Sequence, residues 1–266
     1  MKILIRGAGD IATGIALRLY RAGMQVVMTD LPAPTAIRRT VCFSQAIILG
    51  EMTVEDVTAR RAETPDQAEA LLAQGLIPVL ADPDCTCRTR LRPDALVDAI
   101  LAKRNLGTKI DDAPIVVGIG PGFTAGEDCH AVVETMRGHT LGRVIYRGSA
   151  LPNTNIPGLI GGYAGERVLR APAEGIFCQK LEIGAVVRAG DIAGEVAGQP
   201  MRCTIDGVLR GILADGTPVF RGMKAGDVDP RCKPEYCTTA SDKALAVGGG
   251  VLEALLHLSG ALCDGR

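Results

Sequence analysis

The sequence predicts an α/β protein: a mostly parallel sheet flanked by helices, then a small duplicated β module, then a C-terminal helix. Short apolar runs alternate with segments of helical periodicity over roughly the first 120 residues, which is typical of strand–helix–strand units. Residues 170–196 match residues 202–228 at a constant offset, which indicates an internal repeat. Glycine is abundant, 33 of 266 residues, and this favours many tight turns.

Composition excludes two classes of partner. The 29 basic residues nearly balance 30 acidic ones, and the 3% of aromatic residues include no Trp, so a nucleic-acid partner is not expected. No run approaches the roughly 18 apolar residues of a membrane helix. A strand-like run starts at the first residue, so we expect no signal peptide, and we expect the nine cysteines to be reduced thiols of a cytoplasmic protein.

The elements follow from apolar periodicity and from Gly and Pro punctuation. Strands are expected at 2–6, 25–29, 46–49, 76–80, 113–119 and 143–146. Helices are expected from about residue 10 to Gly23, over 67–74, over 94–105 behind Pro93, and over 241–258. The Gly/Pro/Asn-rich run 151–162 predicts a domain junction. The predicted domains are therefore 1–165, 166–230 and a helical segment 231–266 that packs back on the first domain.

The first turn predicts a nucleotide site. Gly7, Gly9 and Ala12 fit the dinucleotide fingerprint between a strand and a helix, and Asp30 ends the next strand, where an acid can bind ribose hydroxyls. This arrangement predicts a Rossmann-like sheet that binds NAD, NADP or another nucleotide. The alternative is a similar sheet that has lost its ligand or binds another anion.

Neighbouring residues bear on which nucleotide would bind. The expected contacts include the backbone of Asp10 and Ile11 at the helix start, although the Asp10 carboxylate could instead repel a pyrophosphate or cap the helix. Asp30 favours NAD. Arg38 and Arg39 favour a 2′-phosphate or another anion, because guanidinium groups bind phosphates well.

A second glycine loop, 118–126, also follows an apolar strand. Its amides at Gly120 and Gly122, with Thr124, could hold a phosphate or a pterin, whereas the alternative is a rigid turn at the sheet edge. Asp128 and His130 lie close behind and are candidates for acid–base chemistry. The His and acidic residues lack metal-ligand spacing, so no metal site is expected.

Cys85 and Cys87 follow another predicted strand. A Cys-x-Cys pair can bind a soft metal or carry sulfur-like atoms, and Cys85 is a candidate reactive residue. The alternative is a pair of buried, inert thiols.

The repeat and the tail each give one further expectation. Each copy of the repeat reads as short strands between glycine turns, so the two copies must close on each other, as in the hybrid barrel of lipoyl and biotinyl carriers. The joining hairpin, 197–201, has no Lys, so we expect this shape without a swinging arm.

In the tail, Ser241 is a predicted N-cap, and Gly248–Gly250 predict either close backbone packing or a ligand surface.

Several long motifs resemble one family nearly end to end. They are Arg6–Gly14, Ile37–Arg39, Val97–Thr108, Gly120–Gly126, Glu134–His139, Gly226–Arg231 and Ser241–Glu253. They are similar to the YqeB-type accessory proteins of selenium-dependent molybdenum hydroxylases. The resemblance implies a cytoplasmic maturation protein, a molybdopterin-type ligand, and a hydroxylase or another maturation protein as partner. It assigns no catalytic residue.

The leading hypothesis is an accessory protein that binds a nucleotide and helps to mature the molybdenum cofactor or to insert selenium or sulfur. One alternative is an NAD(P)-dependent oxidoreductase of a small molecule that uses Asp128 and His130. Another is a non-catalytic scaffold for the hydroxylase. Self-association into a homo-oligomer is left open.

Overall fold

The computed structural model describes residues 1–154 and 156–261, and the chain divides into two compact units. The sheet unit comprises Met1–Pro34, Cys42–Thr154 and Ala240–Arg266. The β unit comprises Thr35–Val41 and Asn155–Thr239. The sequence placed boundaries at 165 and 230 and did not separate the short segment 35–41 from the sheet unit. The β unit is thus assembled from two separate stretches of chain.

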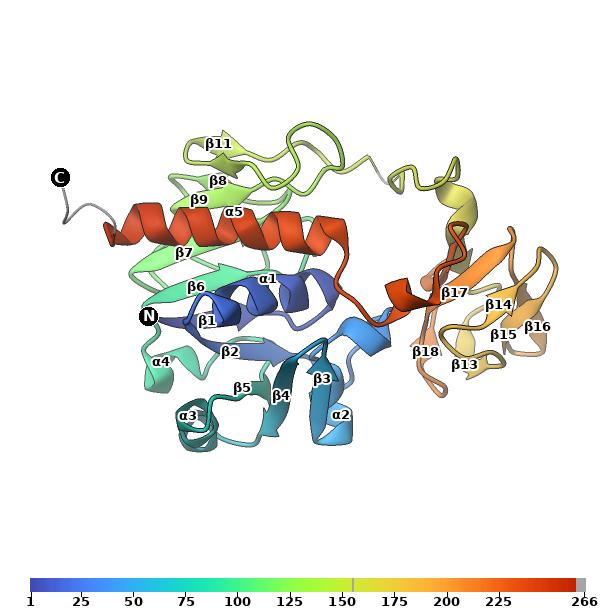
Figure 1. Ribbon diagram of the computed structural model, residues 1–266, viewed down its shortest axis with the longest axis horizontal. Helices are drawn as coiled ribbons and strands as arrows, with labels where there is room; N and C mark the ends of the chain where they lie inside the picture. Colours follow the sequence, from blue (N-terminus) through green and yellow to red (C-terminus); the bar gives the residue numbers. More distant parts are fainter. Residues whose placement is uncertain (155, 262–266) are drawn as a thin grey trace. The chain divides into compact units, whose positions relative to one another are not determined.

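Nine strands form one sheet within residues 1–154, in the order β10-β9-β7-β6-β1-β2-β5-β4-β3 (Figure 1). They are β1 (Lys2–Arg6), β2 (Gln25–Asp30), β3 (Glu51–Val54), β4 (Val57–Ala62), β5 (Ile77–Ala81), β6 (Ala95–Asp98), β7 (Ile115–Ile119), β9 (Ala131–Val133) and β10 (Val144–Ile145). All neighbours pair in parallel except the edge strands β3 and β10. A short pair, β8 (Thr124–Ala125) and β11 (Gly148–Ser149), lies outside this sheet.

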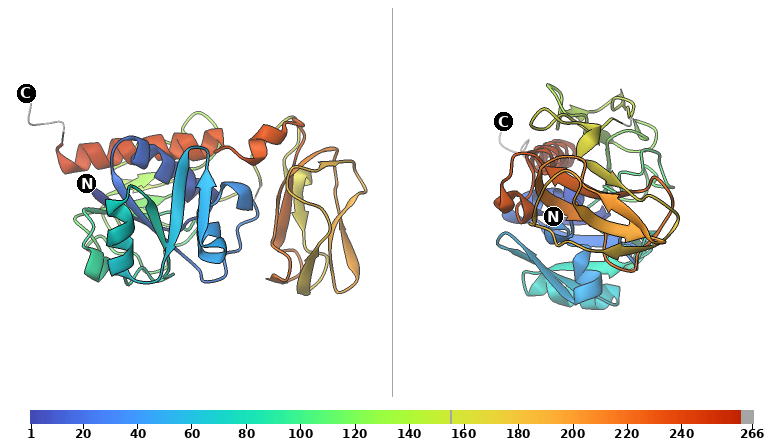
Figure 2. Two further views of the ribbon diagram at one scale, coloured as in Figure 1. Left: turned by 60° about the horizontal axis from the view of Figure 1, so that its bottom comes forward. Right: turned by 90° about the vertical axis from the view of Figure 1, so that its right-hand side faces the viewer.

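The helices of the sheet unit are α1 (Asp10–Arg21), α2 (Gln45–Leu49), α3 (Pro65–Ala73), α4 (Arg88–Leu91) and α5 (Asp242–Ser259). Helices α3 and α4 share one hydrophobic core with alternate strand residues such as Leu4 and Leu96. Helix α5 runs alongside α1 (Figures 1 and 2). The mixed α/β class and the C-terminal helix that the sequence predicts are therefore confirmed.

The order of the strands reverses at β1. From β1 the chain moves to β2 on one side, and after β5 it crosses to β6 on the other side. Arg6 and Asp98, the last residues of β1 and β6, are register partners at this reversal. Open α/β sheets bind ligands at the carboxyl ends of two adjacent strands from which the chain continues in opposite directions. The carboxyl ends of β1 and β6 are therefore the expected position of a site.

Two predicted elements are wrong. Residues 46–49 belong to the helix α2 and not to a strand, because the buried Ala46 and Ile47 pack as a single helical turn. Residues 94–105 do not form a helix: they form the buried strand β6 and a following loop in which Leu101 and Lys103 have positive φ. Burial between β1 and β7 overrides the helix propensity of this Ala- and Leu-rich segment.

Two of the three glycines of α5 pack closely against neighbouring backbone, which favours the close-packing expectation for the tail. A Cβ on Gly248 would lie 2.9 Å from the carbonyl oxygen of Gly14 in α1, and a Cβ on Gly250 would lie 2.2 Å from that of Gly142. A Cβ on Gly249 would meet no atom within 4 Å. The predicted N-cap is confirmed, since Ser241 Oγ accepts a hydrogen bond from the Ala244 amide.

Across residues 156–239, eight strands form two four-stranded sheets, ordered β12-β19-β17-β14 and β16-β15-β13-β18 (Figure 2). They are β12 (Val168–Arg170), β13 (Gly175–Gln179), β14 (Val186–Val187), β15 (Ile192–Val196), β16 (Gln199–Arg202), β17 (Gly207–Ile212), β18 (Pro218–Val219) and β19 (Lys224–Asp229). Short 3₁₀ helices, Arg39–Val41, Gly165–Arg167 and Pro234–Cys237, complete the unit.

The two copies of the repeat exchange strands. The first copy supplies β12 to β15 and the second supplies β16 to β19, and each sheet takes two strands from each copy. Neither copy could complete a sheet alone, which agrees with the expectation that the two must close on each other. The joining hairpin turns at Ala197 and Gly198, both with positive φ, as a two-residue turn between β15 and β16 requires.

Candidate functional site

A buried ion pair lies where the strand order reverses. Arg6 Nη1 lies 3.3 Å from Asp98 Oδ2, and the two residues are 7% and 2% exposed. Thr108 Oγ1 donates a hydrogen bond of 2.6 Å to the same carboxylate oxygen and accepts one of 3.0 Å from Arg6 Nη1. The Arg6 guanidinium also donates to the carbonyl oxygens of Pro83 and Leu106. Arg6 therefore holds together the loops that follow β5 and β6.

Cys85 lies beside this pair, in the loop that follows β5. Asp82 shapes the loop, because its carboxylate accepts hydrogen bonds from the Cys87 amide (2.8 Å) and from Thr86 Oγ1 (3.0 Å). Cys85 has a φ of 58° and is 2% exposed. A non-glycine residue with this backbone conformation is uncommon and is often found at functional sites. Thr29 Oγ1, from the buried strand β2, donates to Cys85 Sγ at 3.7 Å.

The surroundings of Cys85 favour its ionised form. The hydrogen bond from the Cys87 thiol lowers the pKa of Cys85, and the Thr29 hydroxyl and the charge of Arg6 act in the same direction, against burial and the charge of Asp82. The same hydrogen bond raises the pKa of Cys87, and burial acts in the same direction. By contrast, burial raises the pKa of Cys129 to about 11. Cys85 therefore ionises more readily than an ordinary buried thiol, and ionisation is what makes a cysteine nucleophilic.

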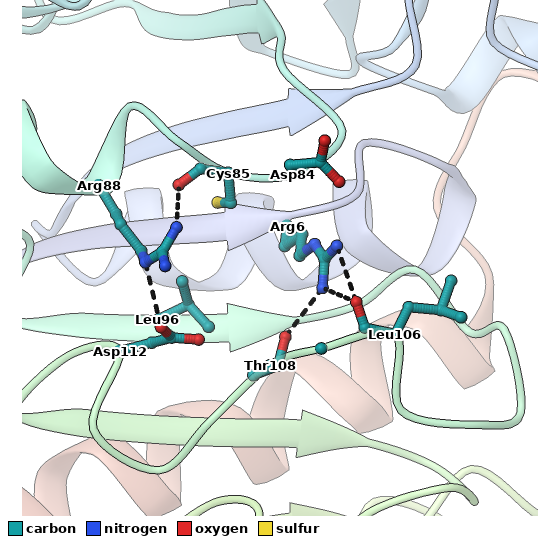
Figure 3. A pocket seen from close by; sticks show the side chains of 9 residues that line it. Arg6, Asp84, Cys85, Arg88, Leu96, Leu106, Thr108 and Asp112 are labelled. Carbon is teal, nitrogen blue, oxygen red and sulfur yellow. Dashed lines mark hydrogen bonds and ion pairs between the residues drawn. The ribbon is translucent and has the colours of Figure 1, made fainter.

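A cavity of about 190 Å³ opens against Cys85, and we call it the Cys85 pocket (Figure 3). Its lining includes Arg6, Asp84, Cys85, Arg88, Leu106 and Asp112. Figure 3 shows the guanidinium groups of Arg6 and Arg88 on either side of the sulfur. The pocket thus combines a sulfur nucleophile with mostly polar walls.

The glycine turn after β1 has the predicted backbone shape. Gly7 has a φ of 106°, and a Cβ there would lie 2.8 Å from the Ala99 carbonyl oxygen, so only glycine fits between the two loops. Gly9 is the N-cap residue of α1, gives no side-chain cap, and has no atom within 4 Å of a Cβ position. Ile11 is buried and Asp10 is half-buried in the first turn of α1.

Asp30 contacts this turn instead of pointing away from it. Its Oδ2 accepts a hydrogen bond of 2.8 Å from the Ala8 amide, and its Oδ1 accepts one of 2.7 Å from the Leu31 amide. Burial raises the pKa of Asp30 in spite of these bonds. Both carboxylate oxygens therefore anchor the protein's own backbone, and the ribose contact that the sequence predicts for Asp30 stays a prediction.

The anchoring role of Asp30 gives a testable prediction. The Asp30→Ala variant should lose about 1–3 kcal/mol of unfolding free energy, because the buried Ala8 amide is left without its acceptor. Urea denaturation followed by circular dichroism measures this loss. The Asp30→Asn variant keeps one carbonyl acceptor and should lose less. Equal stability of the wild type and Asp30→Ala would contradict the anchoring role.

The second glycine loop is explained by packing. A Cβ on Gly122 would lie 2.5 Å from Arg104 Cα, and one on Gly120 would lie 2.7 Å from Thr135 Oγ1. The Thr124 amide donates to Asp128 Oδ2 at 2.8 Å, and Thr124 Oγ1 lies 3.1 Å from Ser149 Oγ. These contacts match a rigid turn at the sheet edge better than a phosphate or pterin site.

The remaining sequence-predicted residues are held by local contacts. Asp128 Oδ1 accepts a further hydrogen bond of 3.2 Å from Asn105 Nδ2, and His130 Nδ1 accepts one of 3.0 Å from the Val116 amide. Arg39 belongs to the β unit, where it donates to the Ile212 carbonyl oxygen at 3.0 Å and to Gln179 Oε1 at 2.8 Å. The candidate site thus consists of Arg6, Cys85 and Asp98. Of these three residues, the sequence predicts only Cys85 as a functional residue.

Metal binding and membrane crossing find no support in the described residues. In that part of the chain, no group of three or more His, Cys, Asp or Glu side chains is arranged to hold a metal ion. Among residues 1–154 and 156–261, no helix combines the length and apolar character needed to cross a bilayer.

Comparison with known proteins gives one strong match. The protein of Escherichia coli (strain K12) described as "Uncharacterized protein YqeB" is 52% identical over 256 residues, which are 96% of this chain and 47% of that protein. This likeness supports the YqeB family. The chain spans about half the length of this YqeB relative. No protein-family model matches the chain.

Solved structures give only weak matches. A succinylglutamate desuccinylase/aspartoacylase from Rhodobacter sphaeroides is 27% identical over 24% of this chain and 22% of that chain, with a TM-score of 0.21. An aspartoacylase family protein from Mesorhizobium loti is 13% identical over 56% of this chain and 60% of that chain, with a TM-score of 0.24. Scores this low carry no argument about fold or function.

Proposed function

We propose that the chain is part of an accessory protein for a molybdenum hydroxylase, and that Cys85 holds a sulfur or selenium atom on its way to the molybdenum cofactor. The observation that carries the proposal is the hydrogen-bonded Cys85 sulfur at the edge of a small polar cavity. The motifs shared with YqeB-type accessory proteins support the choice of client. The proposed client, a hydroxylase or another maturation protein, and the cytoplasmic location follow from that resemblance.

The chemistry needs a nucleophilic sulfur and a donor of the persulfide class. The Cys85 thiolate attacks the outer sulfur of the donor, the bond between Cys85 Sγ and that sulfur forms, and the donor's S–S bond breaks. The donor leaves as a thiolate, and no net oxidation occurs. A selenium atom would transfer in the same way from a perselenide. The Thr29 hydroxyl and the Cys87 thiol stabilise the negative sulfur before the attack.

The size of the cavity limits what it holds. About 190 Å³ accommodates an added sulfur or selenium atom with solvent, but it is below the range of roughly 300–1,000 Å³ that is usual for cofactor-sized ligands. A molybdopterin-type ligand would therefore remain outside the Cys85 pocket. This favours an atom carrier over a carrier of the whole cofactor at this position.

Nucleotide binding at the glycine turn is a second candidate function. The open space at Gly9 and the lack of a side-chain cap there favour it, as does the reversal of strand order next to Gly7, which supports a Rossmann-like description of the sheet. Calorimetry with NAD, NADP, ATP and a pterin phosphate tests it, with Gly9→Val as the variant expected to lose binding. No binding of any of the four by the folded wild type would refute it.

An oxidoreductase and a pure scaffold have less support. An oxidoreductase that uses Asp128 and His130 is disfavoured because both side chains accept hydrogen bonds from backbone amides. The exchange of strands in the β unit supports a module like the hybrid barrel of carrier domains, and its hairpin lacks the Lys of a swinging arm, which favours a structural module. A scaffold without sulfur chemistry would be the remaining interpretation if Cys85 failed the test below.

A loading experiment tests the proposed function. The purified chain is incubated with inorganic polysulfide, and its peptides are examined by mass spectrometry after thiols and persulfides are blocked. We expect one added sulfur on Cys85, and none at that peptide in the Cys85→Ser variant. Cys129→Ser, which removes a buried thiol of raised pKa, is the matched control and should load like the wild type. Equal loading of the wild type and Cys85→Ser would refute the proposal.

A further inference from the structure

A second, larger cavity adjoins the Cys85 pocket. Its volume is about 770 Å³, and it shares Arg88, Gly107 and Asp112 with the smaller cavity, so the two are neighbours along one wall. We call the larger cavity the outer groove. It lies entirely within the sheet unit, between α4 and the loop that leads into β7.

An ion pair lies where the two cavities meet. Arg88 Nε is 3.1 Å from Asp112 Oδ1, and Arg88 Nη1 donates a hydrogen bond of 3.1 Å to the carbonyl oxygen of Cys85 (Figure 3). The Lys109 amide donates to Asp112 Oδ2 at 2.9 Å. Any molecule that passes from the outer groove to the Cys85 sulfur therefore meets Arg88, which also holds the Cys85 backbone in place.

The outer groove carries charges of both signs. Its cations are Arg88, Arg92 and Lys109, and its anions are Asp94, Asp111 and Asp112. Guanidinium and ammonium groups pair with carboxylates, and aspartates pair with ammonium groups. A lining that mixes both signs suits a zwitterion better than a phosphate-rich ligand, which the aspartates would repel. Its volume lies in the range that is usual for small-molecule ligands.

We infer that the outer groove binds the persulfide or perselenide of a short zwitterionic thiol of peptide type. This compound is the donor whose outer sulfur or selenium atom passes to Cys85, while its carbon-bound sulfur leaves as a thiolate. This inference rests on the proposed function of Cys85 and adds the class of its substrate. The carboxylates of the donor would pair with Arg92 and Lys109, and its ammonium group with an aspartate such as Asp111. The sulfur end would then face Arg88 and the Cys85 pocket.

Disulfide exchange measures this recognition with stable probes. Oxidised glutathione is the zwitterionic probe, and 2-hydroxyethyl disulfide is the neutral one. In each reaction the Cys85 thiolate attacks one sulfur, the bond from Cys85 Sγ to that sulfur forms, the probe's S–S bond breaks, and the other half leaves as a thiolate. The rate at Cys85 is followed by mass spectrometry on the full chain.

We expect oxidised glutathione to react at Cys85 at least ten times faster than the neutral probe. Lys109→Gln and Arg92→Gln should each reduce this advantage several-fold, and added salt should reduce it further because the pairs are exposed. Arg90→Gln is the matched control. Arg90 lies on α4, two residues before Arg92, but pairs with Asp66, 2.8 Å away, and does not line the outer groove, so its replacement should leave the ratio unchanged.

Two results would overturn the inference in different ways. If both probes react at Cys85 at one rate in the wild type and in all three variants, the outer groove does not select a zwitterion, while Cys85 remains a nucleophile. If neither probe modifies Cys85 in the folded protein, the proposed function fails together with the inference. Circular dichroism of each variant confirms that the fold is retained.

Discussion

Replacing Gly250 with alanine is expected to lower the free energy of unfolding by about 3 kcal/mol, the upper end of the usual cost of overpacking. The added Cβ would lie 2.2 Å from the carbonyl oxygen of Gly142 and 2.8 Å from Val133 Cγ1. One contact is with backbone, so a change of rotamer cannot relieve it. Helix α5 would have to move away from the sheet or the loop at Gly142 would have to shift, and urea denaturation measures the cost.

Gly249 provides the matched control for Gly250. The same change at the neighbouring position meets no atom within 4 Å and replaces a poor helix former, so Gly249→Ala should stabilise the protein by up to about 1 kcal/mol. The opposite signs at adjacent residues separate steric cost from helix propensity. If both variants were stabilised, the close packing of α5 in this structure would be wrong.

Replacing Arg6 with methionine is expected to cost about 3–5 kcal/mol, because it leaves Asp98 as an unpaired buried charge. The carboxylate would keep only uncharged partners, such as the hydroxyl of Thr108. The loops that meet at Arg6 would also lose their common donor. Urea denaturation measures the loss, and the same variant should slow modification of Cys85, since the charge of Arg6 lowers the pKa of Cys85.

A double variant separates the ion pair from a general loss of packing. Arg6→Met with Asp98→Leu removes both charges, so it should recover much of the stability that Arg6→Met loses. If the double variant were less stable than Arg6→Met alone, the cost would come from lost volume and loop contacts instead of the unpaired carboxylate.

Local patterns predict much of this fold. The segment from Lys2 to Asp30 has its apolar strand, glycine turn, amphipathic helix and second strand where the sequence places them. The internal repeat maps strand for strand onto β12 to β19. Both are features in which neighbouring residues decide the conformation. The repeat also predicts that its two copies close on each other, but which strands pair depends on long-range contacts that local sequence does not contain.

The wrong predictions arise where contacts between residues far apart in the sequence decide the conformation. The segment from Asp94 to Asn105 has the composition of a helix, but it fills the position between β1 and β7. The prediction of a helix placed Asp98 away from any site, so its pairing with Arg6 was missed. Arg6 ends an apolar strand just before Gly7, and a charged residue in that position was the one signal that could have indicated a buried ion pair.

The candidate site, too, is only partly predictable from the sequence. The Cys85 and Cys87 pair is visible in the sequence because its members are close neighbours. Their partners are not, since Thr29 comes from β2 and Arg6 from β1. Those partners distinguish Cys85 from a buried inert thiol. The hydrogen bond from the Ala8 amide to Asp30 could not be predicted for a related reason, because only the fold shows that this amide is within reach of the carboxylate.

The pH dependence of Cys85 alkylation tests the central claim most directly. The rate of modification by iodoacetamide is measured for each cysteine peptide by mass spectrometry. Because the pKa of Cys85 is lowered, its rate should reach half of its maximum at a lower pH than that of an unperturbed thiol, and Cys87→Ala should move this midpoint to higher pH. Cys129, with a pKa of about 11, should react only at much higher pH. The account would be contradicted by a pH midpoint for Cys85 that equals that of Cys129, or by one that stays the same in the Cys87→Ala variant.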